Sequence, residues 1–164
     1  MADPDREVYV MVGDASWLMM SSEVVTSLQE GYKLTIVLID NHGYASIGAL
    51  SESVGSAGFG TEARYRSEGG LLSGDPIKID FAANASSLGA KVIAVDSIPE
   101  FKDALKQAKQ NTATTVIKIE TSRTARVGSY GWWDVPVAEV SEMESVTTAR
   151  ADYDSNRESQ RSYL

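Results

Sequence analysis

Residues 7–16 read EVYVMVGDAS, an apolar run that ends at a glycine and is followed at once by an acidic residue. The β-branched and aromatic residues of this run favour a buried strand from Glu7 to Gly13. Asp14 then stands at the carboxyl end of that strand. Because parallel α/β sheets bind ligands at the carboxyl ends of their strands, this turn is the first candidate site.

A second apolar run, Leu34–Ile39 (LTIVLI), follows a helix predicted over Ser22–Gly31. Neither run alternates polar and apolar residues, so we expect strands that are covered on both faces. Two further strands are predicted at Val92–Val95 and Thr115–Ile119. Strands that alternate with helices indicate an α/β fold with a doubly wound, mostly parallel sheet. We expect this sheet to be incomplete on its N-terminal side, because a buried strand comes almost first.

Helix signals separate the later strands. Asp80 is the predicted N-cap of a helix over residues 80–88, and a capping box at residues 97–100 (SIPE) opens another helix. A second capping box at residues 141–144 is expected to open a last, polar helix that ends near residue 156. The glycine-rich segment 41–76 has little periodicity, and we expect it to be largely disordered without a ligand.

The composition is that of an ordinary globular protein, with 164 residues, 43% hydrophobic residues and a net charge of −8. We interpret residues 1–164 as one partial domain with a C-terminal tail from about residue 121. The negative charge disfavours binding to nucleic acid or to an anionic membrane. The chain has no cysteine, which suits a reducing compartment, and its N-terminus does not resemble a secretory signal. The expected location is therefore cytoplasmic.

A second polar cluster, Asp40-Asn41-His42-Gly43, directly follows a predicted strand. Asp14 and Asn41 are 41 − 14 = 27 positions apart, with a helix and a strand between them. A carboxylate, an amide oxygen and a backbone carbonyl form a set of hard oxygen ligands that suits Mg²⁺. The free amides of the turn after Gly13 favour an anion such as diphosphate, and a divalent cation would keep Asp14 from repelling it.

This arrangement resembles the cofactor motif of thiamine-diphosphate-dependent enzymes, a Gly-Asp-Gly start followed about 27 positions later by an Asn pair or Asp-Asn. The resemblance implies that Mg²⁺ is bound by Asp14, Asn41 and the carbonyl of Gly43. It also implies that the cofactor's diphosphate is lined by these residues together with Gly13, Ala15 and Ser16. Ala15 departs from the motif, which usually has glycine there, and it would weaken the site if that position required a positive φ.

Three longer stretches, Val10–Met20, Leu38–Gly60 and Trp132–Ser141 (WWDVPVAEVS), resemble one branch of this family. Its members open the ring of a trihydroxycyclohexane-1,2-dione, a cyclic polyol-dione, in myo-inositol breakdown. The resemblance implies a diphosphate-binding domain that shares its cofactor with the pyrimidine-binding domain of another subunit in a homo-oligomer. The glutamate that activates the cofactor would lie outside this chain, so no catalytic residue is assigned and the isolated chain is expected to be inactive.

Two other functions remain open. The chain could belong to another thiamine-dependent enzyme, a decarboxylase or carboligase of 2-keto acids, or it could be a non-catalytic binding or assembly module. An ordinary nucleotide-binding domain has no support, because the sequence has neither a G-x-G-x-x-G after a strand nor a G-x-x-x-x-G-K-[ST] loop.

Several other residues have a structural and a functional interpretation. His42 could be a general base, but we favour a role in holding its loop. Tyr44 could flank the cofactor or simply pack. Structural roles are favoured for the aromatic pair of the tail, as packing anchors, for two loop arginines, as solvated charges, and for three apolar residues after the first turn, as core. These are Trp132 and Trp133, Arg64 and Arg66, and Leu18, Met19 and Met20.

Overall fold

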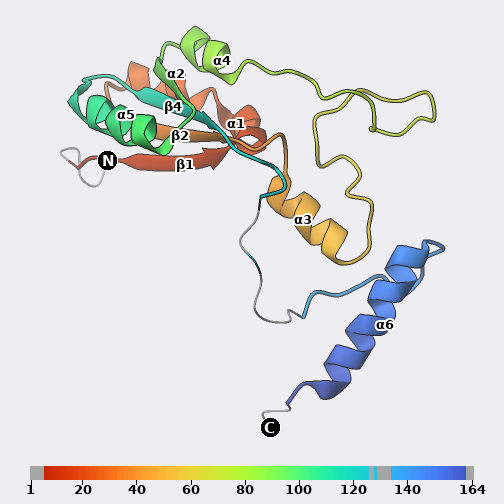
Figure 1. Cartoon of the computed structure of the whole chain (residues 1–164). Helices are drawn as coiled ribbons and strands as arrows, with labels where there is room; N and C mark the ends of the chain where they lie inside the picture. Colours follow the sequence, from red (N-terminus) through yellow and green to blue (C-terminus); the bar gives the residue numbers. More distant parts are fainter. Residues whose placement is uncertain (1–5, 126–127, 129–133, 162–164) are drawn as a thin grey trace. The chain divides into compact units, whose positions relative to one another are not determined.

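The structure, a computed structural model, describes residues 6–125, 128 and 134–161 (Figure 1). Trp132 and Trp133 lie outside the described residues, so their predicted role as packing anchors stays a prediction. The internal contacts divide the chain into two units. Unit 1 comprises residues 1–44 and 76–123, and unit 2 comprises residues 45–75 and 124–164. The assignment of the whole chain to a single partial domain stays a prediction.

Unit 1 contains a sheet whose described strands are ordered β1-β2-β4-β3. All three neighbouring pairs are parallel, which confirms the predicted α/β fold with a parallel sheet. The apolar runs in the sequence correspond to β1 (Tyr9–Gly13), β2 (Thr35–Asp40), β3 (Lys91–Val95) and β4 (Thr115–Glu120).

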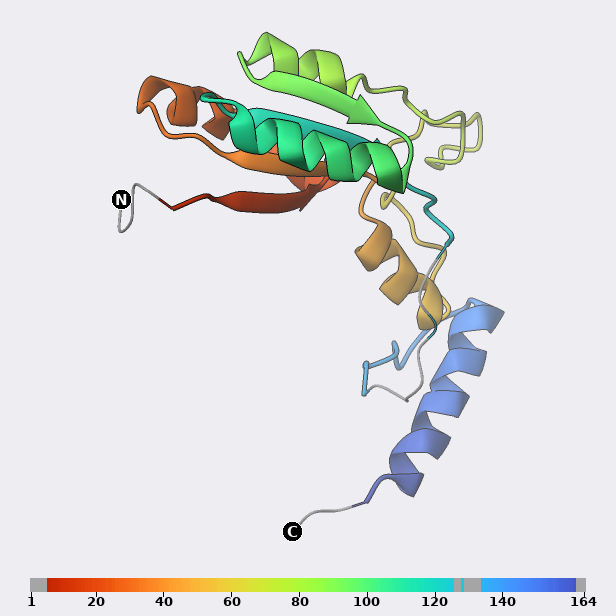
Figure 2. The same cartoon turned by 60° about the vertical axis from the view of Figure 1, so that its left-hand side comes forward.

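Helices cover both faces of this sheet. The helices of unit 1 are α1 (Asp14–Met20), α2 (Glu23–Gln29), α4 (Phe81–Ser87) and α5 (Ile98–Gln110). Figure 2 shows α5 on one side of the sheet and α4 on the other. Successive residues of a strand point to opposite faces, and in β4 Val116 packs with α1, α2 and α4, whereas Ile117 packs with α5. Across the sheet, the chain moves in one direction from β1 to β2 to β3. It then returns from β3 to β4, which lies between β2 and β3. Because parallel crossovers are right-handed, the returning crossover through α5 must lie on the opposite face.

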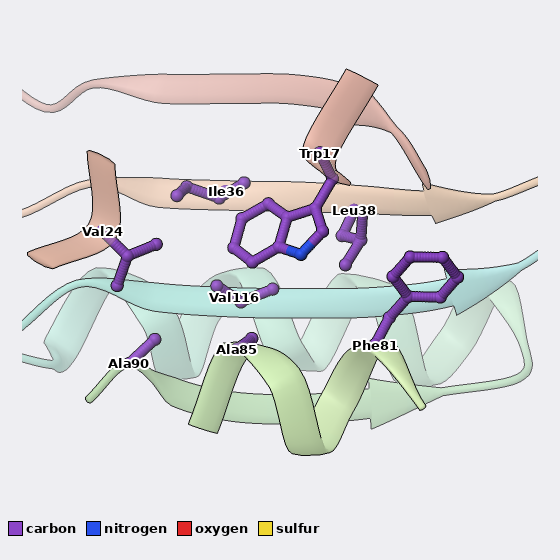
Figure 3. Packing of buried hydrophobic residues seen from close by; sticks show 8 residues of the cluster. All are labelled: Trp17, Val24, Ile36, Leu38, Phe81, Ala85, Ala90 and Val116. Atoms are coloured by element: carbon purple, nitrogen blue, oxygen red, sulfur yellow. The ribbon is translucent and has the colours of Figure 1, made fainter. Parts of the chain in front are cut away.

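The main core lies between the sheet and the face formed by α1, α2 and α4 (Figure 3). Leu38 and Val116 are fully buried at its centre, and Trp17 reaches over the strands from α1. The indole Nε1 of Trp17 donates a hydrogen bond to Asn84 Oδ1 at 2.8 Å, so the polar edge of the ring is satisfied. Burial of each large apolar side chain contributes about 1.5–3 kcal/mol.

The predicted helix starts in unit 1 are largely confirmed. Asp80 Oδ1 accepts a hydrogen bond from Ala83 N at 2.8 Å, as an N-cap does. Ser97 Oγ accepts from Glu100 N at 3.4 Å, which is half of the predicted capping box. The other half is shifted by one residue, because the Glu100 carboxylate accepts from Asp96 N rather than from Ser97 N.

Three apolar residues of α1, Leu18, Met19 and Met20, do not lie in the core, so the expectation that they are core residues was wrong. Leu18, Met19 and Met20 are 48%, 64% and 65% exposed. α1 has only seven residues, and its inward-facing positions are occupied by Ala15 and Trp17. The next buried side chain is that of Val24 in α2, so Leu18, Met19 and Met20 lie in the exposed stretch between the buried Trp17 and the buried Val24.

Unit 2 contains α3 (Ala45–Ser53) and α6 (Glu144–Ser159). Its small core is formed by the buried side chains Val137, Val146 and Tyr153, with Val54 and Ala149 packed against them. α3 corrects the expectation that segment 41–76 is irregular throughout. Whether the rest of that segment is ordered without a ligand stays a prediction.

The predicted capping box of the last helix was wrong. α6 begins at Glu144 with Met143 as its N-cap, and no side chain caps it. Ser141 Oγ accepts a hydrogen bond from Met143 N at 3.1 Å, outside the helix. The hydroxyl therefore stabilises the turn that precedes α6 rather than the first turn of the helix.

Candidate functional site

The pairing of β1 with β2 brings the two polar clusters to one edge of the sheet. Gly13, the last residue of β1, is in register with Ile39 of β2, so Asp14 and Asn41 follow adjacent strand ends. Gly43 N donates a hydrogen bond to Asp14 Oδ2 at 2.7 Å. Two clusters that are 27 positions apart in sequence are therefore in direct contact (41 − 14 = 27).

The orientation of the Asn41 side-chain amide decides what Asp14, Asn41 and Gly43 can bind together. With its nitrogen turned inward, the amide donates to Gly43 O at 2.7 Å and to Asp14 Oδ1 at 2.9 Å. In the opposite orientation its oxygen occupies the same position, and three oxygens then face one another without a hydrogen between them. Adjacent ligand oxygens of octahedral Mg²⁺ lie about 2.9 Å apart, because each is about 2.1 Å from the ion. The residues thus fit a magnesium ion, and the amide can turn to hydrogen-bond when the ion is absent.

Asp14 is a buried carboxylate, with 3% of its surface exposed. Desolvation by burial raises the pKa of Asp14 above its ordinary value of 3.8, and the nearby charge of Asp40 adds to this rise. Hydrogen bonds from the backbone of Gly43, Ala15 and Asn41 oppose it by stabilising the carboxylate. A buried carboxylate with a raised pKa is poorly compensated, and a bound cation would remove that penalty.

The turn after β2 depends on His42, whose backbone has a φ of 66°. Among the described residues it is the one non-glycine residue with a positive φ, in the left-handed region that costs L-residues roughly 1–2 kcal/mol. This turn directs Gly43 N toward Asp14. The imidazole lies 3.7 Å from Asp40 Oδ1 and 3.4 Å from Glu120 Oε1. These contacts favour the interpretation that His42 holds its loop.

Ala15 carries no backbone strain. It belongs to α1, which begins at Asp14, and it has no positive φ. Gly13 precedes the helix as its N-cap in an extended conformation, with a φ of −76°. The alanine in place of the usual glycine therefore fits this turn. Ser16 is exposed on the same helix, where its hydroxyl can reach a ligand. Contacts of Gly13, Ala15 and Ser16 with a diphosphate stay predictions.

Lys118 is a member of the site that the sequence alone did not reveal. Its ammonium lies 3.1 Å from Asp40 Oδ2 and 3.3 Å from Glu120 Oε2. Desolvation lowers the pKa of Lys118, but the hydrogen bonds and charges of Asp40 and then Glu120 outweigh it, so the pKa lies above its ordinary 10.5. The signal in the sequence was a lysine inside the apolar strand TVIKIE.

The other candidates do not add a second site. Arg64 pairs with Glu62 at 2.6 Å and donates to Gly74 O, and Arg66 donates to Gly70 O, so both arginines bond within their own loop. Tyr44 is 37% exposed. Throughout the described ranges, no three His, Cys, Asp or Glu side chains gather as a metal cluster. In the same ranges no helix is long and apolar enough to cross a membrane.

Comparison with known proteins adds relatives to this geometry. The chain is 46% identical to "3D-(3,5/4)-trihydroxycyclohexane-1,2-dione hydrolase 2" of Bacillus cereus, over 99% of this chain and 26% of that protein. It is 45% identical to a protein of the same activity name from Bacillus anthracis, with the same coverage. The chain therefore spans about a quarter of the length of these relatives.

Solved structures of the same fold are also similar. A thiamine diphosphate-dependent 4-hydroxybenzoylformate decarboxylase of Rhodococcus jostii RHA1 matches with a TM-score of 0.58 and 25% identity, over 74% of this chain and 21% of that one. A benzoylformate decarboxylase from Polynucleobacter necessarius matches with a TM-score of 0.57 and 23% identity, again over 74% and 21%.

The family itself is decided by a match that covers most of the chain. Residues 1–119 match the family described as "Thiamine pyrophosphate enzyme, C-terminal TPP binding domain". This range contains Asp14, Asn41 and Gly43, whose oxygens form the candidate metal site (the oxygen cluster). It also contains nearly all of the four described strands. The chain belongs to the family of thiamine pyrophosphate enzymes, and it matches their C-terminal cofactor-binding domain.

Proposed function

We propose that this chain is the Mg²⁺- and thiamine diphosphate-binding part of a cytoplasmic hydrolase that breaks a carbon–carbon bond of trihydroxycyclohexane-1,2-dione in myo-inositol breakdown. The observation that carries the cofactor assignment is the convergence of Asp14, Asn41 and Gly43 at adjacent strand ends, with 2.7 Å and 2.9 Å between their polar atoms. The substrate assignment is supported by the relatives of 44–46% identity that carry this activity in their names.

In this proposal the Asp14 carboxylate, the Asn41 amide oxygen and the Gly43 carbonyl hold the Mg²⁺. One carboxylate leaves the ion with a net positive charge, which binds the diphosphate that Asp14 alone would repel. The backbone N–H groups and the hydroxyl of the turn at Ala15 and Ser16 would donate to the diphosphate, and Gly13 leaves space for it. These residues fix the anionic end of the cofactor and so orient its reactive ring.

When bound, thiamine diphosphate supplies the nucleophilic carbon and the electron sink that cleavage of a carbon–carbon bond beside a carbonyl requires. The group that activates the cofactor would come from the pyrimidine-binding domain of another subunit in a homo-oligomer. The contacts to the cyclic dione would lie there as well. Under this proposal the isolated chain binds cofactor but does not turn over substrate.

A 2-keto acid decarboxylase is the second candidate, and the structure of the 4-hydroxybenzoylformate decarboxylase favours it, whereas the benzoylformate decarboxylase structure shows the fold alone. Their 25% and 23% identity is well below the 46% of the named hydrolase, so we favour the hydrolase. Assays of the native polypeptide that carries this sequence, with the cyclic dione and with benzoylformate, separate the two. Carbon dioxide release from benzoylformate without ring opening of the dione would support the decarboxylase.

The cofactor assignment is tested by titrating that polypeptide with thiamine diphosphate in a calorimeter, with Mg²⁺ and with EDTA. We expect binding with Mg²⁺ and little without it. Asp14→Ala should abolish the Mg²⁺-dependent part, because it removes the one carboxylate ligand. Asp103→Ala is the matched control, since it removes a carboxylate that is 74% exposed on α5. Unchanged binding by Asp14→Ala would refute the metal assignment.

A further inference from the structure

Lys118 occupies a position in β4 where an apolar residue would be expected. Side chains at alternate positions of a strand share a face, and Thr114 and Val116, which share the face of Lys118, are fully buried. Across the sheet, Lys118 is in register with Leu38, another fully buried residue. Only 18% of the Lys118 side chain is exposed. A lysine so placed is stable only if its ammonium has partners.

Those partners are two carboxylates at the ends of neighbouring strands. The ammonium lies 3.1 Å from Asp40 Oδ2 and 3.3 Å from Glu120 Oε2, and Asp40 is in register with Glu120. The two carboxylates differ in exposure, since the side chain of Asp40 is 9% exposed and that of Glu120 is 60% exposed. The Lys118 ammonium, at 3.1 Å, is closer to the buried Asp40 carboxylate than His42 Nδ1 is, at 3.7 Å, whereas the Glu120 carboxylate is largely exposed to solvent.

Asp40 directly precedes Asn41 and carries charge beside the oxygen cluster. Its backbone carbonyl accepts a hydrogen bond from Thr121 N at 2.8 Å, which continues the pairing of β2 with β4. Burial raises the pKa of Asp14, and the negative charge of Asp40 adds to that rise. An Asp40 carboxylate without a counter-ion would repel a diphosphate and could turn toward a cation held by Asn41.

We propose that Lys118 is a positioning residue for cofactor binding, which acts through Asp40. Its ammonium neutralises this carboxylate and holds it against β4. The backbone of the turn at residues 41–43 then presents the Asn41 amide and the Gly43 carbonyl without competition from Asp40. The inference rests on the proposed function, because it requires that Asn41 and Gly43 hold the Mg²⁺ of a diphosphate cofactor.

The test compares the thiamine diphosphate affinity of variants of the native polypeptide at a saturating Mg²⁺ concentration. Lys118→Met keeps the length and apolar stem of the side chain but removes its charge. We expect this variant to bind about 10- to 100-fold more weakly, the range typical of groups that hold a metal ligand in place. Lys118→Arg should retain most of the affinity, because it retains the charge. Lys106→Met is the control, since it breaks an ion pair of 2.8 Å at an exposed position on α5.

A second substitution separates positioning from folding. In an Asp40→Asn variant the buried carboxylate beside the oxygen cluster is absent, so its charge no longer needs neutralisation. Adding Lys118→Met to that variant should therefore leave the thiamine diphosphate affinity unchanged. The shift in unfolding temperature on addition of cofactor should shrink in Lys118→Met and recover in the double variant. If Lys118→Met alone does not fold, the comparison of Asp40→Asn with the Asp40→Asn, Lys118→Met double variant still tests whether Lys118 acts through Asp40.

The outcomes distinguish the inference from the proposed function. Absence of Mg²⁺-dependent binding in the unsubstituted polypeptide overturns the proposed function, and this inference with it. Normal binding in both the unsubstituted polypeptide and Lys118→Met overturns the inference alone. An affinity loss that persists with Asp40→Asn also overturns it, because Lys118 would then not act through Asp40.

Discussion

At the scale of single residues, the proposed function of Asp14 conflicts with its effect on stability. A carboxylate that is 3% exposed and has a raised pKa disfavours the folded state when it is ionised. The contribution of Asp14 to stability is fully present below pH 3.8, the ordinary pKa of the group, and is lost as the pH rises through its raised folded pKa. Bound Mg²⁺ would reverse this loss, because it favours the ionised form.

Asp14→Asn should therefore stabilise the metal-free protein at neutral pH by about 1 kcal/mol while it removes Mg²⁺-dependent cofactor binding. The amide can still accept from Gly43 N and can donate to the oxygen of Asn41. Urea unfolding at neutral pH and below pH 3.8, with EDTA present, measures the effect. The gain should appear only at the higher pH. Asp103→Asn, at an exposed carboxylate, should show no such gain. A less stable Asp14→Asn protein at neutral pH would contradict the prediction.

At the scale of elements, the sequence was most informative where hydrophobic burial decides the structure. The strands were predicted to within a few residues, because unbroken runs of β-branched and aromatic residues favour strands. The expectation that the first run is covered on both faces was wrong, since Tyr9 and Met11 of β1 are 51% and 74% exposed. The N-caps Asp80 and Ser97 were predicted because their hydrogen bonds are local. The capping box at residues 141–144 failed because the turn before α6 also offers a backbone N–H to Ser141 Oγ, and nothing in a four-residue pattern decides between the two.

The candidate site was predicted only in part, for a related reason. Asp14 and Asn41 could be found because each directly follows a strand, and parallel strands end at one edge. Lys118 could not be recognised, since its role depends on the register that sets it beside Asp40. A single sequence does not specify which strand lies next to β2. The exposure of Leu18, Met19 and Met20 was missed because an apolar run does not reveal which of its side chains face the sheet.

Gly55 provides a prediction at this scale, because it lets the chain after α3 approach α6. Its φ is 82°, and a Cβ there would lie 2.8 Å from Val146 Cα and also against the Ser145 carbonyl. Ser145 Oγ donates to Gly55 O at 2.7 Å across the same contact. Gly55→Ala should separate the two segments and lower the free energy of unfolding of unit 2 by about 2–4 kcal/mol, from backbone strain and overpacking together.

Gly60→Ala is the matched control for this prediction. Gly60 lies in the same unit with a φ of 74°, but a Cβ there would have no atom within 4 Å. It should therefore show only the backbone cost, roughly 1–2 kcal/mol. Hydrogen exchange of the α6 amides measures the local stability. Equal effects of the two substitutions would mean that the approach of Gly55 to α6 does not stabilise unit 2.

At the scale of the whole molecule, the chain passes between the two units at residues 44–45, 75–76 and 123–124. The first crossing comes directly after Gly43, a proposed metal ligand. From Val54 to Asp80 the chain has no helix or strand among those assigned, and Thr61 is the one residue in that stretch classed as buried. A stretch with few buried side chains has little local stability, so it opens more readily than the sheet.

Trypsin should therefore cleave the metal-free protein first after Arg64, Arg66 and Lys78, before it cuts within the sheet. Thiamine diphosphate with Mg²⁺ should slow these cuts, because Asn41 and Gly43 would hold the start of the chain that leads through α3 into this stretch. Mass spectrometry of timed digests gives the order of the cuts. Asp14→Ala should lose the protection while keeping the order.

The matched reference for this digestion is α6. A glutamyl protease cuts this helix at its glutamates, and the helix is far along the chain from the proposed metal ligands. Its cleavage should not respond to the cofactor, because no proposed ligand adjoins it in sequence. Resistance of residues 54–76 without cofactor, equal to that of the sheet, would refute the prediction that segment 41–76 is largely disordered when no ligand is bound. If the cofactor still protects the Asp14→Ala variant from cleavage, the segment is ordered by contacts other than those of the turn at residues 41–43.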